Sequence, residues 1–123
     1  MRAFVPKGWT RPIITAASKR TSEWERMVTQ VASAQGWQVI ADQPFRVRLV
    51  FALRRPKRMP KARRDMITKP DLDKLTRAIL DALTGVVWHD DAQVVRLVAV
   101  KRYISTTDEE PHVDIWAASR SDN

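Results

Sequence analysis

Two pairs of aspartates stand at the two ends of one short stretch of this chain. Asp71 and Asp73 open the stretch KPDLDKLTRAILDALTGVVWHDD, and Asp90 and Asp91 close it. Carboxylates that converge on one point bind hard divalent cations, but aspartates at helix ends and in turns also act as ordinary caps. The chain has a formal net charge of +8, so four carboxylates at the ends of one short stretch require an explanation. From the pattern alone, a metal site and a set of caps both stay open.

The spacing of the first pair restricts where a helix can begin. Residues two apart on an α-helix point about 200° away from each other, so Asp71 and Asp73 cannot share a site if both are helical. They can converge if Asp71 lies at or before the N-cap in extended geometry, and Pro70, which suits a first helical turn, puts the boundary here. Asp73, Arg77 and Asp81 then follow at i, i+4 and i+8. This stripe is either two exposed ion pairs or a place where Arg77 meets a phosphate.

The available ligand types restrict the metal. The chain has no cysteine, and His89 beside the second pair has no partner at ligand spacing, so it is expected to be structural or to line the site. Oxygen ligands without sulfur suit Mg²⁺, with Mn²⁺ as a substitute, rather than Zn²⁺. Carboxylate-held metals beside cationic side chains are suited to phosphodiester hydrolysis.

Basic residues elsewhere indicate a polyanionic partner. The chain has 22 Lys and Arg against 14 Asp and Glu, and nucleic acid is the commonest partner of such a protein. An acidic membrane surface is the rival, but no basic amphipathic helix and no apolar run of about 20 residues is present. Basic residues gather in an irregular arm over residues 1–20 and a loop over residues 55–69, which are either solvated segments or phosphate contacts. The residues expected to contact DNA are Lys7, Arg11, Lys57, Arg58, Lys61, Arg63, Arg64 and Lys69.

Periodicity predicts the elements that position these residues. A Ser22–Glu25 capping box begins a first helix that stops at Gly36, and a second helix carries an apolar stripe until Gly85. Strands are expected at residues 45–53, about 93–103 and 112–117, and the middle one, apolar on both faces, is expected to be interior. This order predicts an α+β two-layer sandwich, a small mixed sheet with helices packed on one face. Residues 1–123 are expected to form one cytoplasmic domain.

The stretch KPDLDKLTRAILDALTG, followed by VVWHDDAQV, resembles the RusA family of Holliday junction resolvases, found in bacteria and phages. The resemblance implies a metal-dependent endonuclease that binds four-way DNA junctions as a homodimer and cuts two strands symmetrically. The resemblance assigns the family's three essential carboxylates to Asp71, Asp73 and Asp91. The C2 homodimer also has a physical reason, because two symmetric cuts need two sites related by a two-fold axis.

Two features depart from the family pattern. Arg77 stands where the family has its catalytic lysine, so it can stabilise charge but cannot transfer a proton near neutral pH. Lys74 stands where the family has asparagine, and we expect Lys74 and Asp90 to support the site. The family's first strand is expected to be largely missing.

The sequence therefore predicts a Mg²⁺-dependent, structure-selective endonuclease that resolves four-way junctions in recombination and repair. A non-catalytic DNA-binding module with the same fold and a general metal-dependent nuclease are the alternatives.

Overall fold

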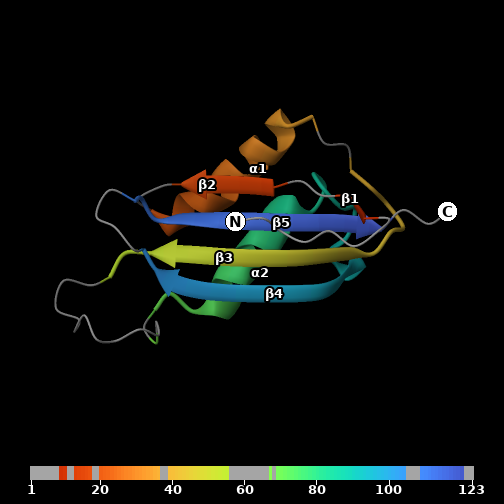
Figure 1. Cartoon of the computed structure of the whole chain (residues 1–123). Coiled ribbons are helices and arrows are strands. Elements are labelled where there is room, and N and C mark those ends of the chain that lie inside the picture. Colours follow the sequence, from red (N-terminus) through yellow and green to blue (C-terminus); the bar gives the residue numbers. More distant parts are fainter. Residues whose placement is uncertain are drawn as a thin grey trace.

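The computed structural model describes residues 9–10, 13–17, 20–36, 39–55, 67, 69–104 and 109–120. In this part of the chain, two α-helices and one five-stranded sheet form the fold (Figure 1). The strands are β1 (Trp9–Thr10), β2 (Ile13–Ala17), β3 (Phe45–Leu53), β4 (Val94–Tyr103) and β5 (His112–Arg120). The helices are α1 (Trp24–Ala34) and α2 (Leu72–Leu83), and two 3-10 turns are η1 (Thr21–Glu23) and η2 (Asp91–Gln93).

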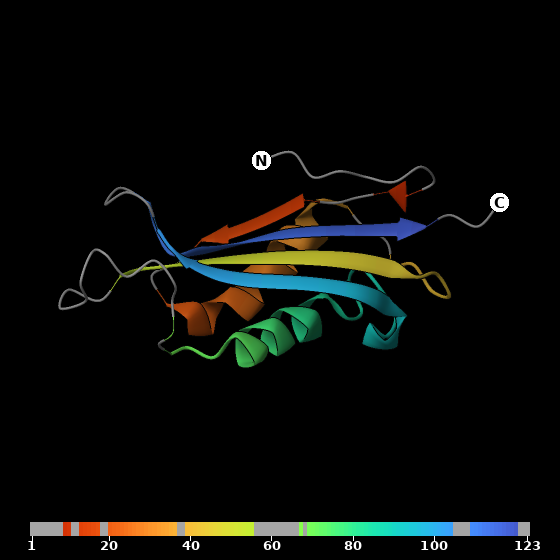
Figure 2. The ribbon, with the colours of Figure 1, turned by 60° about the horizontal axis from the view of Figure 1, so that its bottom comes forward.

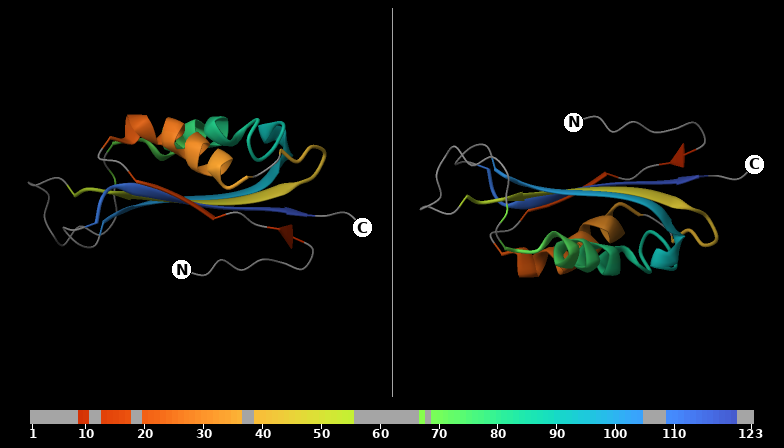
Figure 3. Two further views of the ribbon diagram at one scale, coloured as in Figure 1. Left: turned by 90° about the horizontal axis from the view of Figure 1, so that it is seen from above. Right: turned by 90° about the horizontal axis from the view of Figure 1, so that it is seen from below.

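The sheet is mixed and carries its helices on one side. Its strand order is β1-β5-β3-β4, and β2 also pairs with β5. Strands β3 and β4 are parallel, so a crossover must join them, and α2 lies in that crossover. The other strand pairs are antiparallel. Both helices lie on the same face of the sheet (Figures 2 and 3), which confirms the predicted α+β two-layer architecture.

The core fills the space between the helices and the sheet. In β3, the alternating residues that face the helices are buried, as its period of two predicts. Trp24 of α1 stacks on Phe51, with ring centroids 6.0 Å apart, and Phe45 meets Trp88 edge-on at 5.3 Å. Fully burying a large apolar side chain contributes about 1.5–3 kcal/mol, so these contacts fix α1 and the segment that follows α2 on the sheet.

The predicted start of the first helix is wrong, whereas that of the second is confirmed. Ser22 lies inside the turn η1, and the N-cap of α1 is Glu23, which makes no side-chain capping bond. A capping serine needs extended backbone, so the predicted Ser22–Glu25 capping box does not form. Asp71 is the N-cap of α2 and has extended dihedral angles, φ −70° and ψ 135°. Pro70 therefore lies before the helix rather than in its first turn.

The prediction of an irregular arm over residues 1–20 is wrong for part of that segment. Both β1 and β2 pair with β5 in antiparallel register, with Ile13 opposite Trp116 and Ala17 opposite His112. The prolines that argued against regular structure stand outside these strands, and the run IITAA is rich in the β-branched residues that strands favour.

The prediction of an interior position for β4 is also wrong. In the sheet formed by the described residues, β4 is the last strand and pairs with β3 alone. A run that is apolar on both faces is typical of a strand with neighbours on each side. Here the same pattern leaves apolar side chains exposed, and the exposed fractions are Val95 65%, Leu97 42%, Val98 40% and Val100 43%.

Candidate functional site

An open groove of about 730 Å³ lies between α2 and β4. The two elements run in opposite directions, because Lys101 near the end of β4 donates a 3.0 Å hydrogen bond to the carbonyl of Pro70, just before α2. The turn that precedes β4 therefore lies toward the other end of α2. The residues that line the groove are Leu72, Asp73, Thr76, Arg77, Leu80, Asp81, Asp91, Leu97 and Ala99.

The wall of the groove that α2 forms carries two acidic side chains with one basic side chain between them. Asp73, Arg77 and Asp81 are exposed and stand one helical turn apart, with a rise of about 6 Å per step along the axis. Within the described residues, none of the three makes an ion pair, so the stripe is not neutralised internally. A ligand in the groove therefore meets one guanidinium between two carboxylates.

The turn η2 holds Asp91 at the end of the groove that lies toward the C-terminus of α2. Asp90 caps this turn by accepting a 2.9 Å hydrogen bond from the backbone N–H of Ala92. The Oε1 atom of Gln93 accepts 2.9 Å bonds from the backbone N–H groups of His89 and Asp90, which completes a capping box. Asp91 itself is left exposed to the groove.

Gln93 also fixes the turn to a distant part of the chain. Its Nε2 atom donates 2.9 Å hydrogen bonds to the carbonyls of Ile40 and Gln43. The sequence interpretation missed this residue, although Gln93 stands three residues after Asp90, the spacing of a capping box. Gln93 thus positions Asp91 without lining the groove.

Asp71 lies apart from the other carboxylates and is held by lysines. Its Oδ2 atom is 3.7 Å from Nζ of Lys69 and 3.8 Å from Nζ of Lys74. Its side chain is 42% exposed, and exposed ion pairs contribute only about 0–1 kcal/mol, so these contacts are easily exchanged. The structure therefore brings Asp73, Arg77 and Asp91 to one groove and leaves Asp71 just before the helix that forms its wall.

The fit of this site to a divalent cation is partial. Carboxylate oxygens are the donors that Mg²⁺ prefers. Yet within the part of the chain that the structure describes, no three His, Cys, Asp or Glu side chains are gathered so that they could hold a metal ion. The donors fit a hard cation by type, whereas their arrangement does not enclose one.

Most residues predicted to contact DNA fall outside the described part of the chain. Lys69 is described, and it lies beside Asp71. The others lie in segments that the structure does not describe, and they are Lys7, Arg11, Lys57, Arg58, Lys61, Arg63 and Arg64. No helix among the described residues is long and apolar enough to cross a membrane.

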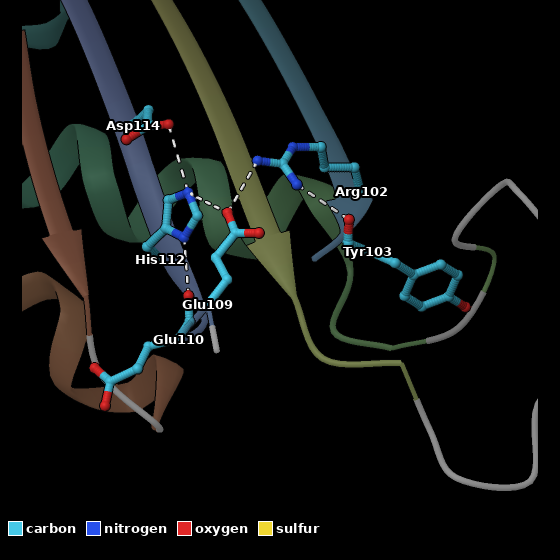
Figure 4. A network of polar contacts seen from close by, with 6 residues as sticks. All are labelled: Arg102, Tyr103, Glu109, Glu110, His112 and Asp114. Carbon is cyan, nitrogen blue, oxygen red and sulfur yellow. Dashed lines mark hydrogen bonds and ion pairs between the residues drawn. The ribbon is translucent and has the colours of Figure 1, made fainter. Parts of the chain in front are cut away.

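A second polar cluster lies on the sheet face opposite the helices (Figure 4). His112 Nε2 is 3.4 Å from Glu109 Oε1 and 3.5 Å from Asp114 Oδ2, and Arg102 pairs with the same Glu109 oxygen at 3.4 Å. The remaining ring nitrogen of His112 lies 2.9 Å from the carbonyl of Glu110. None of these residues lines the groove, so the cluster ties β4 and β5 together rather than extending the site.

The fold and the groove define a class: a small α+β domain with carboxylates and a guanidinium lining a groove between a helix and a strand. The sequence profile of the endodeoxyribonuclease RusA family matches residues 4–116. The chain therefore belongs to the RusA family, and the predicted resemblance is confirmed. A segment of 48 residues is 42% identical to the uncharacterized protein YqaN of Bacillus subtilis (strain 168), and it covers 39% of this chain and 31% of YqaN.

Proposed function

We propose that this protein is a Mg²⁺-dependent, structure-selective endonuclease that resolves four-way DNA junctions by paired, symmetric cuts. The observation that carries this proposal is the groove that Asp73, Arg77 and Asp91 line, in a chain that belongs to an endodeoxyribonuclease family. We place its activity in recombination and repair, in the cytoplasm of a bacterium or a phage-infected cell.

In this proposal, Asp71, Asp73 and Asp91 hold the divalent cation, and Mn²⁺ substitutes for Mg²⁺. A bound ion would supply a water molecule whose pKa is lowered, and it would neutralise negative charge on the phosphate. Asp71 stands just before the first turn of α2, and its partners Lys69 and Lys74 hold it only through long, exposed ion pairs that a cation can replace. Lys74 then stays close by as a supporting cation, and Asp90 keeps the turn of Asp91 in place.

Arg77 is proposed to bind the phosphate at the centre of the groove. A guanidinium matches two phosphate oxygens at once and remains charged at neutral pH, so it positions the group and stabilises developing negative charge. It transfers no proton. Its place between Asp73 and Asp81, with no ion pair to any described residue, leaves its donors available for this contact.

A C2 homodimer is proposed to supply the two active sites that paired cutting needs. The exposed apolar side chains of Val98 and Val100, at the edge of the described sheet, support an association of two copies.

The basic segments over residues 1–20 and 55–69 are proposed to bind the DNA backbone. Replacing both Arg63 and Arg64 by glutamine is expected to weaken binding to all DNA sequences and to reduce the slope of log K against log salt by about 2, since each phosphate contact contributes about 1. Filter binding at several salt concentrations between about 50 and 200 mM measures this slope. An unchanged slope would remove these arginines from the DNA interface.

The assay that tests the proposed function compares a synthetic four-way junction with a linear duplex of matched sequence, each with and without Mg²⁺. We expect paired nicks at symmetric positions, in the junction alone and only with Mg²⁺. Binding without metal-dependent cutting would favour a DNA-binding module that retains the fold. Equal cutting of the duplex would favour a general metal-dependent nuclease.

A further inference from the structure

The hydroxyl of Thr76 is buried and unpaired in the wall of the groove. Thr76 is only 8% exposed, and its Oγ1 atom has no hydrogen-bond partner in the described part of the chain. A buried hydroxyl without a partner destabilises the protein, and such groups are uncommon in folded proteins. The same residue lines the groove beside Asp73 and Arg77. Its unpaired state therefore needs an explanation.

Two other threonines show what a helical hydroxyl ordinarily does here. The hydroxyl of Thr29 in α1 lies 3.0 Å from the carbonyl oxygens of both Glu25 and Ala82, and Thr84, the C-cap residue of α2, donates a 2.9 Å bond to the carbonyl of Leu80. Both have the carbonyl four residues earlier within hydrogen-bond distance, the local partner that suits a helical threonine. Thr76 leaves this option unused. The missing bond is thus specific to the threonine in the groove.

The surroundings of Thr76 indicate what its hydroxyl would bind. Leu72 and Leu80 lie one turn to either side, and Leu97 and Ala99 of β4 also line the groove, so the hydroxyl is buried in an apolar part of the groove wall. A hydrogen bond made here is stronger than one made in water. Threonine divides between two χ1 rotamers in helices, so a single torsion turns the hydroxyl toward the groove.

We propose that Thr76 donates a hydrogen bond to a phosphodiester oxygen of the DNA strand in the groove, next to the oxygens that Arg77 binds. The ligand class follows from the donors: a guanidinium and a hydroxyl on adjacent residues of α2 together suit an anion with several acceptor oxygens. Thr76 is then a substrate-positioning residue, and this inference rests on the proposed nuclease function.

The test uses Thr76→Val, which keeps the shape and removes the hydroxyl, and Thr76→Ser, which keeps the hydroxyl. Thr76→Val is expected to lower kcat/KM for junction cleavage about tenfold, the value of one hydrogen bond to a charged group, and to weaken metal-free junction binding. Its melting temperature is expected to be unchanged or raised by about 2–6 °C, because an unpaired buried hydroxyl is lost. Thr76→Ser is expected to cut within about threefold of the wild type, since the donor is retained.

The outcomes separate this inference from the function on which it rests. Wild-type protein that neither cuts nor binds the junction overturns the proposed function, and the inference falls with it. If wild-type protein cuts and Thr76→Val cuts equally well, only the inference is overturned. It is also overturned if Thr76→Ser is as impaired as Thr76→Val, or if Thr76→Val melts several degrees lower, because both results indicate a packing role.

Discussion

Replacing Asp91 by asparagine is expected to reduce junction cleavage at least about 100-fold while junction binding persists. The substitution keeps the size of the side chain and removes a negative charge that lines the groove. In the proposed function, binding depends on basic residues elsewhere, so it should weaken little or even strengthen as a repulsive charge is lost. Single-turnover cleavage with Mg²⁺ and gel-shift binding without it measure the two effects separately.

The neighbouring residue provides a matched control for this prediction. Asp90 caps the turn through its bond with the N–H of Ala92, and asparagine caps as well as aspartate does. Asp90→Asn is therefore expected to cut within about threefold of the wild type and to melt at the same temperature. Equal loss in both variants would mean that the acidity of the turn, rather than Asp91 itself, matters. A fully active Asp91→Asn protein would remove Asp91 from the proposed site.

The fold could be predicted where local periodicity is strong. The alternation over residues 45–53 and the apolar stripe over residues 72–83 both give elements with the bounds that the structure shows. The position of a strand within the sheet cannot be predicted from local periodicity, because it depends on which strands pair. The apolar run of β4 has the composition of an interior strand, yet it lies at the edge of the described sheet. Likewise, the pairing of β2 with β5 joins segments about a hundred residues apart, which no local pattern reveals.

The candidate site, too, could be predicted only in part from the sequence. Helix geometry showed that Asp71 could share a site with Asp73 only from extended backbone outside the helix, Pro70 placed the helix boundary there, and the dihedral angles of Asp71 confirm its extended backbone. Nothing local placed Asp91 at the same groove as Asp73, because that placement depends on the antiparallel packing of β4 against α2. Thr76 was overlooked since a threonine within an apolar stripe resembles core packing. Its unpaired hydroxyl is visible only in three dimensions.

Replacing Gln93 by leucine is expected to destabilise the protein by about 2–4 kcal/mol, because its amide makes four hydrogen bonds of about 1 kcal/mol each. The loss leaves the carbonyls of Ile40 and Gln43 without this donor and frees the turn that presents Asp91. The melting temperature should fall by about 10 °C, as a change of this size gives in a small domain. Cleavage measured well below the new melting temperature should also fall, since Asp91 is no longer held against the groove.

Two further variants identify which bonds of Gln93 matter. Gln30→Leu makes the same substitution on the exposed face of α1 and is expected to leave the melting temperature nearly unchanged. Gln93→Glu keeps the acceptor for the N–H groups of His89 and Asp90 but removes both donors to residues 40 and 43. Because a carboxylate would face two carbonyls, Gln93→Glu should be at least as unstable as Gln93→Leu if the long-range anchor dominates. A Gln93→Glu protein that melts like the wild type would instead assign the stability to the capping box. Equal melting of Gln93→Leu and Gln30→Leu would contradict any anchoring role, and Asp91 would then owe its position to the backbone of η2 alone.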